Sequence, residues 1–216
     1  SAAADLRRIL RPSGEASGQT GPPGIIEQIL ALGKWGRATG RTLDRDDWLR
    51  HAKIGGVEHE YWFLKHRQRV VKITLPGFYG QMPTPRADGT PGLRPATPLE
   101  YLDRLALSNR IFADDFRVMG IVDDRAGPRI VISQPVVVGE RPENGEIDAY
   151  MEALGFSRLT NKSMFVREND LIGVFDGHQG NFLRGATGQI FAIDVIPVRI
   201  GPALWRAIQL QRAFPP

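Results

Sequence analysis

The residues most able to carry out chemistry lie near the end of the chain: two acidic residues and an amide. The segment Phe175-Asp-Gly-His-Gln-Gly-Asn181 releases Asp176 from an apolar strand into a glycine-rich turn. Thirteen residues after Asn181, Asp194 stands inside the apolar run Ala192–Ile196. A buried carboxylate is costly unless it is paired or bound to a metal, so Asp194 is a candidate cation ligand. The alternative is structural: Asp176 and Asn181 are turn residues, and Asp194 is a strand-end carboxylate with satisfied hydrogen bonds.

Lys72 is the next candidate, because it interrupts a run of β-branched apolar residues. In Arg69-Val-Val-Lys-Ile-Thr-Leu75, strand alternation puts Val70, Lys72 and Thr74 on one face. An exposed lysine on the outer face of an edge strand would give the same pattern. Alternatively, the lysine face lines a cleft.

Composition excludes several other chemistries. The 216 residues include no cysteine, which rules out disulfides, thiolate nucleophiles and cysteine-bound metals. The four histidines are too dispersed for a multi-histidine metal site, and no apolar run reaches the roughly 18 residues that span a membrane. The net charge is +4 and the 28 basic residues are scattered, so a nucleic-acid-binding surface is disfavoured. The first residues lack a basic-then-apolar signal, which favours a cytoplasmic location.

The elements that must position these residues follow from hydrophobic periodicity, which predicts an α+β fold rather than alternating βαβ units. Residues 11–24 are rich in glycine and proline and indicate a linker, and residues 77–98 indicate a loop. The β-branched run 129–138 is expected to be a central strand. Helices are expected at residues 1–10, 25–32, from about 43, 98–112, 145–154 and 202–213, and strands at residues 57–64, 68–75, 116–123, 129–138, 163–167, 171–176 and 189–198.

Taken in order, the strand lysine, the Asp-x4-Asn loop and the aspartate thirteen residues later resemble the protein-kinase superfamily. The loop is more similar to that of the aminoglycoside phosphotransferases, whose pattern is Asp-x-His-x-Gly-Asn. More closely still, residues 53–198 resemble the kinase-like domain of bacterial and phage polyvalent proteins. Besides the loop, this resemblance rests on the segments Glu58–Glu60, Arg69–Ile73, Pro98–Leu102, Ser133–Pro135 and Glu146–Phe156.

The resemblance implies an ATP- and Mg²⁺-dependent transfer of the γ-phosphoryl group to a hydroxyl of a protein or small molecule. In that role Lys72 would hold the α- and β-phosphates. Asp194 and Asn181 would be the oxygen ligands of the metal. Asp176 would orient the attacking hydroxyl and accept its proton. We therefore expect the side chains of Lys72 and Asp194 to face one cleft.

The resemblance also implies a helix glutamate that pairs with the strand lysine. Glu100 matches this position, but it matches equally well as the third residue of a capping box that begins at Thr97. Asp103, one turn later, is the substitute partner. The chain contains no GxGxxG motif, so Gly55 and Gly56 are the candidates for a phosphate-covering turn.

The resemblance places the hinge after the strand that ends near Ser133. Its backbone at Pro135, Val136 and Val137 would meet the adenine, with Gln134 just before it. His178, inside the Asp-x4-Asn loop, is expected to be structural rather than a base.

His59 and Glu60 would lie near the phosphates under the same resemblance. A solvated hairpin explains both residues as well and is the preferred interpretation.

These patterns predict an α+β, compact protein-kinase-like fold of two lobes, with an antiparallel N-lobe sheet and a reduced C-lobe. The expected parts are a helical N-terminal arm with its linker (1–52), the N-lobe and hinge (53–139), and the C-lobe with the catalytic loop and metal site (140–216). Few residues follow Asp194, which leaves the acceptor open and is compatible with part of a larger multidomain polypeptide. The alternatives are a nucleotide-binding pseudokinase or interaction module without turnover, and a basic nucleic-acid-binding domain.

Overall fold

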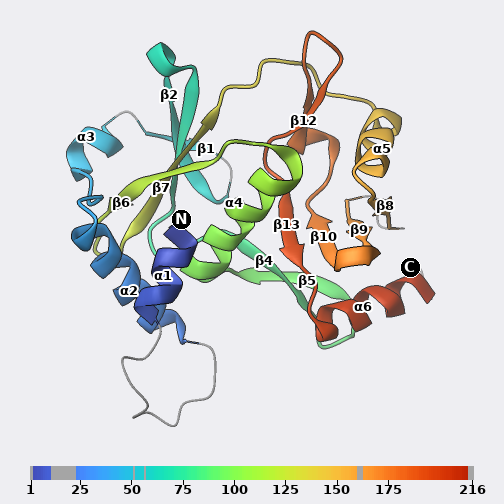
Figure 1. The fold of residues 1–216 in the computed structure, drawn as a ribbon, viewed down its shortest axis with the longest axis horizontal. Helices are drawn as coiled ribbons and strands as arrows, with labels where there is room; N and C mark the ends of the chain where they lie inside the picture. The colour runs from blue at the N-terminus through green and yellow to red at the C-terminus, as the bar shows by residue number, and fades with distance from the viewer. Residues whose placement is uncertain (1, 11–22, 51, 56, 160–162, 214–216) are drawn as a thin grey trace. The chain divides into compact units, whose positions relative to one another are not determined.

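The computed structural model describes residues 2–10, 23–50, 52–55, 57–159 and 163–213 (Figure 1). The predicted linker therefore lies largely outside the described residues. Contacts between residues divide the chain into two units: residues 1–80, 95–106 and 116–135, and residues 81–94, 107–115 and 136–216. Helices and antiparallel sheets occur in both, which confirms the α+β class. Among the described residues, no helix has the length and apolarity needed to cross a membrane.

The first unit contains a five-stranded antiparallel sheet in the order β1-β2-β3-β7-β6. A 3-10 turn (Lys65–Arg67) joins β2 to β3, and Gln68 ends that turn in a left-handed conformation with φ of 48°. Because β7 lies between β3 and β6, the expectation of a central β-branched strand is confirmed. The strands are β1 (Lys53–Gly55), β2 (His59–Leu64), β3 (Arg69–Thr74), β6 (Arg117–Val122) and β7 (Arg129–Pro135).

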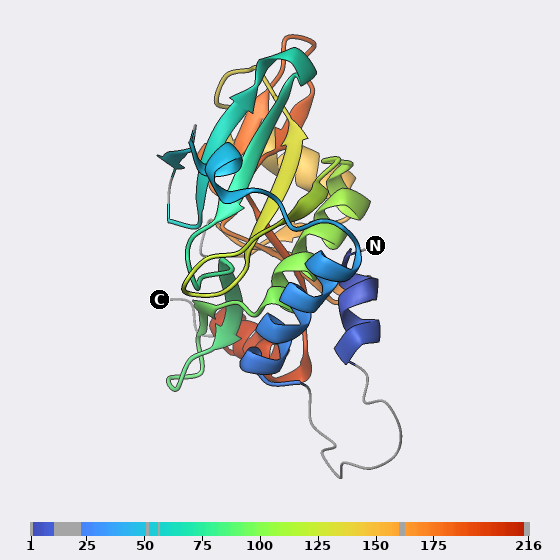
Figure 2. The same ribbon diagram turned by 90° about the vertical axis from the view of Figure 1, so that its left-hand side faces the viewer.

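Helices α1 (Ala2–Leu10) and α2 (Ile25–Ala38) lie side by side (Figures 1 and 2). Helix α2 continues for six residues beyond residue 32, where it is predicted to end. Packing explains Gly36 of this helix, because a Cβ there would lie 2.5 Å from the side chain of Ile121 on β6. One core of this unit joins residues of α1, α2, the first turns of α4 (Pro98–Phe112) and the sheet: Leu6, Leu32, Trp35, Tyr101, Leu105, Ile121, Ile130 and Ile132.

The chain between α2 and the short helix α3 (Arg45–Leu49) covers the outer edge of β6. Thr42 forms a parallel bridge with Ile121, and Gly120 permits the approach because a Cβ there would lie 2.3 Å from the Arg41 carbonyl oxygen. Pairing of this kind removes an exposed sheet edge. The carboxylate of Asp44 accepts hydrogen bonds from two backbone amides and caps α3.

The second unit contains a four-stranded sheet in the order β13-β10-β9-β8 and a two-stranded sheet of β11 and β12. Helix α5 (Asn144–Ala153) packs its buried Ile147 and Met151 into one core, and helix α6 (Pro202–Ala213) packs Leu204 and Ile208 into another. Both helices lie where they are predicted. The strands are β8 (Ser157–Arg158), β9 (Phe165–Arg167), β10 (Ile172–Phe175), β11 (Phe182–Arg184), β12 (Ile190–Ala192) and β13 (Ile196–Arg199).

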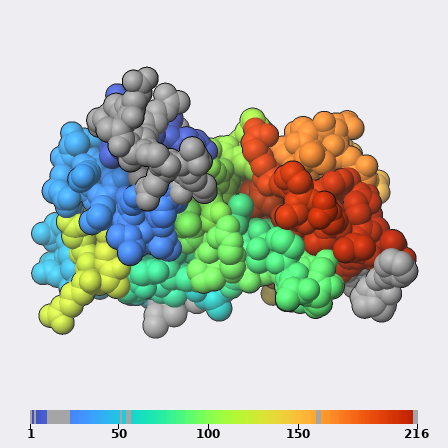
Figure 3. Space-filling view, turned by 90° about the horizontal axis from the view of Figure 1, so that it is seen from below, coloured from blue at the N-terminus to red at the C-terminus, as the bar shows by residue number. Residues whose placement is uncertain are grey.

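The prediction of a loop over residues 77–98 is wrong, because this segment contains a hairpin of β4 (Gln81–Pro85) and β5 (Pro91–Pro95). Prolines are tolerated because each strand of a two-stranded ribbon has a free edge. The turn uses Gly89 at φ 80° and the carboxylate of Asp88, which accepts the backbone N–H of Thr90 at 2.9 Å. Figure 3 shows this hairpin (green) beside α6 (red).

Two strand predictions also need correction. The single strand predicted over residues 189–198 is two strands, because β12 pairs with β11 whereas β13 pairs with β10. Asp194 lies in the connection between them, not inside a strand. Periodicity could not reveal this break, since Val195 in the connection is as buried as the strands. The strand predicted over residues 129–138 ends at Pro135, where pairing with Arg69 of β3 stops.

Candidate active site

The loop that follows β10 holds Asp176 and Asn181 in direct contact. The side-chain amide of Asn181 donates hydrogen bonds to the carbonyl oxygen of Asp176 at 2.7 Å and to its Oδ2 at 2.9 Å. Asn181 is buried, whereas Asp176 is exposed and has a left-handed φ of 54°. Such a conformation is uncommon outside glycine, although aspartate and asparagine adopt it more readily than most residues. The loop therefore presents the carboxylate of Asp176 to solvent on a locked backbone.

His178 stabilises the same loop from inside it. Its Nδ1 accepts the backbone N–H of Gly180 at 3.0 Å, so the imidazole caps the 3-10 turn Gln179–Asn181. Its Nε2 lies 3.4 Å from Oδ1 of Asp176. The expectation that His178 has a structural position is consistent with this capping.

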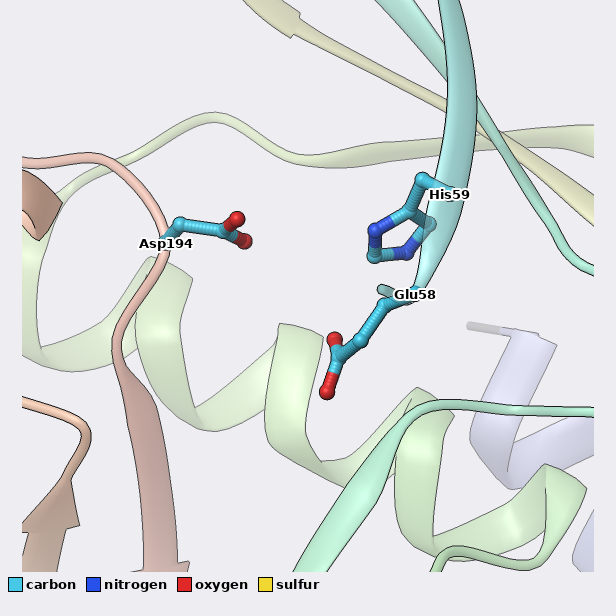
Figure 4. A group of neighbouring side chains, drawn as sticks. All are labelled: Glu58, His59 and Asp194. Atoms are coloured by element: carbon cyan, nitrogen blue, oxygen red, sulfur yellow. The ribbon is translucent and has the colours of Figure 1, made fainter. Parts of the chain in front are cut away.

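Asp194 is tied to the same loop through the backbone. The N–H of Ile193 donates to the carbonyl oxygen of Asn181 at 2.9 Å, directly beyond the β11–β12 pair Phe182–Ala192. The thirteen residues from Asn181 to Asp194 therefore span the β11–β12 hairpin, which brings the chain back beside Asn181. Asp194 is half-buried and follows this contact by one residue. Figure 4 draws its side chain in the segment that leads into β13.

In the first unit, Lys72 lies on an interior strand, not on an edge strand. β3 is the middle strand of its sheet, and Lys72 is paired with Tyr61 on one side and with Ile132 on the other. Ile132 belongs to the core that includes Tyr101 of α4, so Lys72 is on the sheet face that α4 covers. The side chain is half-buried. The edge-strand interpretation of Lys72 is therefore wrong.

Two buried polar pairs join the start of β2 to α4. Arg104 donates to Oε2 of Glu58 at 2.9 Å, and the side chains of this ion pair are 7% and 11% exposed. Nε2 of His59 lies 2.8 Å from the hydroxyl oxygen of Tyr101. Figure 4 draws Glu58 and His59 where the chain enters β2. Gly80 lies against the Glu58 carboxylate, where a Cβ would come within 3.0 Å of Oε2. The φ of Gly80 is 80°, a left-handed conformation that also favours glycine.

These pairs overturn the preferred interpretation of His59 and Glu60 as a solvated hairpin. His59 is 5% exposed, and Glu60 pairs with the buried Arg129 at 3.0 Å. The sequence patterns do not single out Arg104 either, because a lone helix arginine usually lies in solvent. Only the spacing of Tyr101 and Arg104 could have indicated this: they are three residues apart and so lie on one face of α4.

Glu100 forms the predicted capping box. Its Oε2 accepts the backbone N–H of Thr97 at 2.9 Å, and the Thr97 hydroxyl accepts the N–H of Glu100 at 3.3 Å. Another backbone N–H in the first turn of α4, that of Leu99, donates to the side-chain oxygen of Gln28 at 3.1 Å. Asp103 forms an ion pair with Arg7 of α1. The pairing of Glu100 with Lys72 remains a prediction.

The remaining nucleotide-binding candidates lie at strand ends. Gly55 ends β1, and Gly56 lies outside the described residues. Gln134 is buried next to the end of β7, and the chain passes from the first unit to the second between Pro135 and Val136. Val137 follows in the second unit. The assignment of a hinge to these residues, and the expected approach of Lys72 and Asp194, remain predictions.

Comparison with known proteins agrees with a kinase-like α+β fold. Residues 27–199 match the model of a family described as serine/threonine/tyrosine kinases found in polyvalent proteins. Because the match spans most of the chain, the chain belongs to this family, and the resemblance stated from its motifs is confirmed. No curated protein and no solved structure matches the chain.

Proposed function

We propose that this kinase-like domain is an active phosphotransferase that uses ATP and Mg²⁺ and transfers the γ-phosphoryl group to a hydroxyl. The observation that carries the proposal is the loop of the second unit, in which Asn181 binds Asp176 and the backbone of Ile193 binds Asn181. Phosphoryl transfer depends mainly on positioning and charge neutralisation, so a rigid constellation of oxygen-bearing side chains suits it. The family description names serine, threonine and tyrosine, which favours a protein hydroxyl as the acceptor.

The donor set of the second unit fits a magnesium ion. Mg²⁺ prefers oxygen ligands, and Asp194 and Asn181 offer a carboxylate and an amide oxygen. Because the Nδ2 end of Asn181 is engaged by Asp176, the oxygen end of its amide points elsewhere and is available to a cation. A bound Mg²⁺ would neutralise phosphate charge on the nucleotide. Lys72 would add a fixed positive charge for the α- and β-phosphates.

Asp176 would act on the acceptor. The acceptor oxygen forms a bond to the γ-phosphorus, the bond from that phosphorus to the bridging oxygen of ADP breaks, and the hydroxyl proton passes to the Asp176 carboxylate. The hydrogen bond from Asn181 and the contact with His178 hold this carboxylate in one orientation. A general base needs such positioning within hydrogen-bond reach of the proton it accepts.

A second candidate function is nucleotide binding without turnover, and the absence of a GxGxxG motif from the sequence favours it. Two measurements on the same protein separate the candidates: a thermal-shift titration with ATP, with and without Mg²⁺, and an assay of labelled γ-phosphate transfer to itself and to a peptide mixture. Mg²⁺-dependent ATP stabilisation with transfer supports the kinase. Stabilisation without transfer supports the pseudokinase, and no stabilisation by any nucleotide overturns both.

A further inference from the structure

Gln134 is a buried glutamine whose oxygen is unused. The residue is 8% exposed, and among the described residues its Oε1 accepts no hydrogen bond. Two other buried polar side chains of the same sheet are paired: the Thr74 hydroxyl accepts a hydrogen bond from the N–H of Ile130 at 3.0 Å, and the Ser133 hydroxyl accepts one from Nε of Arg69 at 3.1 Å. Buried acceptors almost always have a partner, so this exception needs an explanation.

The two residues directly beside Gln134 on this face of the sheet carry no side-chain donor. On β3 the residue directly opposite is Val70, and the next residue on the same face of β7 is Ile132. Both neighbours are apolar. The following residue, Pro135, has no backbone N–H to offer. A buried amide oxygen without a partner at the end of a strand is suited to a donor on a bound molecule.

The same face of the sheet also carries Lys72. Because Lys72 is opposite Ile132, Gln134 is its diagonal neighbour on the adjacent strand. Diagonal neighbours in antiparallel sheets are about 7–8 Å apart at the backbone, and a lysine carries its ammonium on a flexible four-carbon stem. A ligand that placed anionic groups at Lys72 could therefore place a hydrogen-bond donor at Gln134.

We propose that Oε1 of Gln134 accepts a hydrogen bond from the 6-amino group of adenine and so selects ATP over GTP. This inference rests on the proposed function and names a specificity-determining residue of its nucleotide site. Adenine has an amino donor at position 6, whereas guanine has a carbonyl oxygen there. Two acceptor oxygens would repel each other, so the same side chain that binds adenine disfavours guanine.

The first experiment changes only the nucleotide. The affinities of the full chain for ATP, for GTP and for purine riboside triphosphate, which lacks the 6-amino group, are measured by calorimetric titration with Mg²⁺. We expect purine riboside triphosphate to bind about tenfold more weakly than ATP, because a buried acceptor then loses its partner. GTP should bind more weakly still.

The second experiment changes the protein. Gln134→Met keeps an unbranched side chain of similar length but has no amide oxygen. In this variant ATP and purine riboside triphosphate should bind with the same affinity. The matched control is Gln211→Met on α6, because Oε1 of Gln211 is the other buried glutamine oxygen among the described residues that has no hydrogen-bond partner. This control should keep the preference for ATP.

The outcomes separate this inference from the function on which it rests. If the parent binds ATP and purine riboside triphosphate equally, or if Gln134→Met keeps the preference for ATP, the role of Gln134 is overturned while nucleotide binding stands. A parent that prefers GTP would also overturn it, because the amide would then donate rather than accept. If none of the three nucleotides binds, the proposed function fails, and the inference fails with it.

Discussion

The side-chain amide of Asn181 binds Asp176 twice, once at its carbonyl oxygen and once at its carboxylate. The amide therefore locks both the left-handed backbone of Asp176 and the orientation of its side chain. The distance of five residues between the two is what allows this double contact across a single 3-10 turn.

Asp176→Asn should abolish transfer but not nucleotide binding. Asparagine tolerates the left-handed conformation, so the loop should keep its shape. The amide cannot accept the hydroxyl proton, and we expect the transfer rate to fall by about 10²–10⁴-fold with nearly unchanged ATP affinity. Asp170→Asn is the matched control, because Asp170 is an exposed partner of Arg167 in the same unit. A transfer rate equal to that of the parent would make Asp176 a turn residue only.

Asp194→Asn should remove the effect of Mg²⁺ on ATP binding. A neutral amide is a poor substitute for a carboxylate on a hard cation. The expected result is that ATP raises the melting temperature of the variant equally with and without Mg²⁺, while the melting temperature without ligand stays close to that of the parent. Equal Mg²⁺-dependent shifts in the variant and the parent would exclude Asp194 as the metal ligand.

Arg104→Met should destabilise the protein by about 3 kcal/mol, because it removes the guanidinium that neutralises the buried carboxylate of Glu58. The double variant Glu58→Leu with Arg104→Met should recover most of this loss, because a buried ion pair can be replaced by apolar side chains at small cost. The more exposed pair of Arg212 with Glu168 provides the control: Arg212→Met should cost less than about 1 kcal/mol. Urea unfolding curves measure all three, and similar losses for Arg104→Met and Arg212→Met would contradict the prediction.

Thr97→Ala and Glu100→Ala should each lower the free energy of unfolding by about 1 kcal/mol, because each removes one half of the capping box. The comparison also tests the second role proposed for Glu100. If Glu100 in addition orients Lys72, its variant alone will weaken ATP binding. Equal ATP affinities of the two variants would leave Glu100 with its capping role only.

Stability should fall at high pH because of Tyr79. Burial raises the pKa of Tyr79 from 10.0 to about 12, so the unfolded chain loses this proton at lower pH than the folded one. The contribution of protonated Tyr79 to the free energy of unfolding is thus complete below about pH 10 and is lost as the pH rises towards 12. Tyr79→Phe removes the hydrogen bond to the Pro128 carbonyl and should cost about 1 kcal/mol at pH 7. Denaturant titrations at each pH measure the free energy of unfolding. Between pH 10 and 12 this free energy should fall less steeply with pH for Tyr79→Phe than for the parent. Equal slopes for the two proteins would contradict the prediction.

The sequence alone was sufficient where the signal is local. The helix over residues 98–112, its cap at Thr97 and Glu100, and the final helix over residues 202–213 were predicted within their observed bounds. Capping depends on residues three apart, and helix periodicity on residues three and four apart, so neither needs the rest of the fold. The order of Lys72, Asp176, Asn181 and Asp194 was likewise sufficient to indicate the kinase family, which the match over residues 27–199 confirms.

Tertiary structure decided what depends on strand pairing and burial. Only pairing with different partners separates β12 from β13 and leaves Asp194 in the connection between them. Only the strand order makes Lys72 an interior residue. The buried environment of His59 comes from Tyr101, 42 residues away, and the unused oxygen of Gln134 from apolar neighbours such as Val70 on another strand. Contacts between residues far apart in the chain leave no periodic trace in the sequence, so only the folded structure could reveal them.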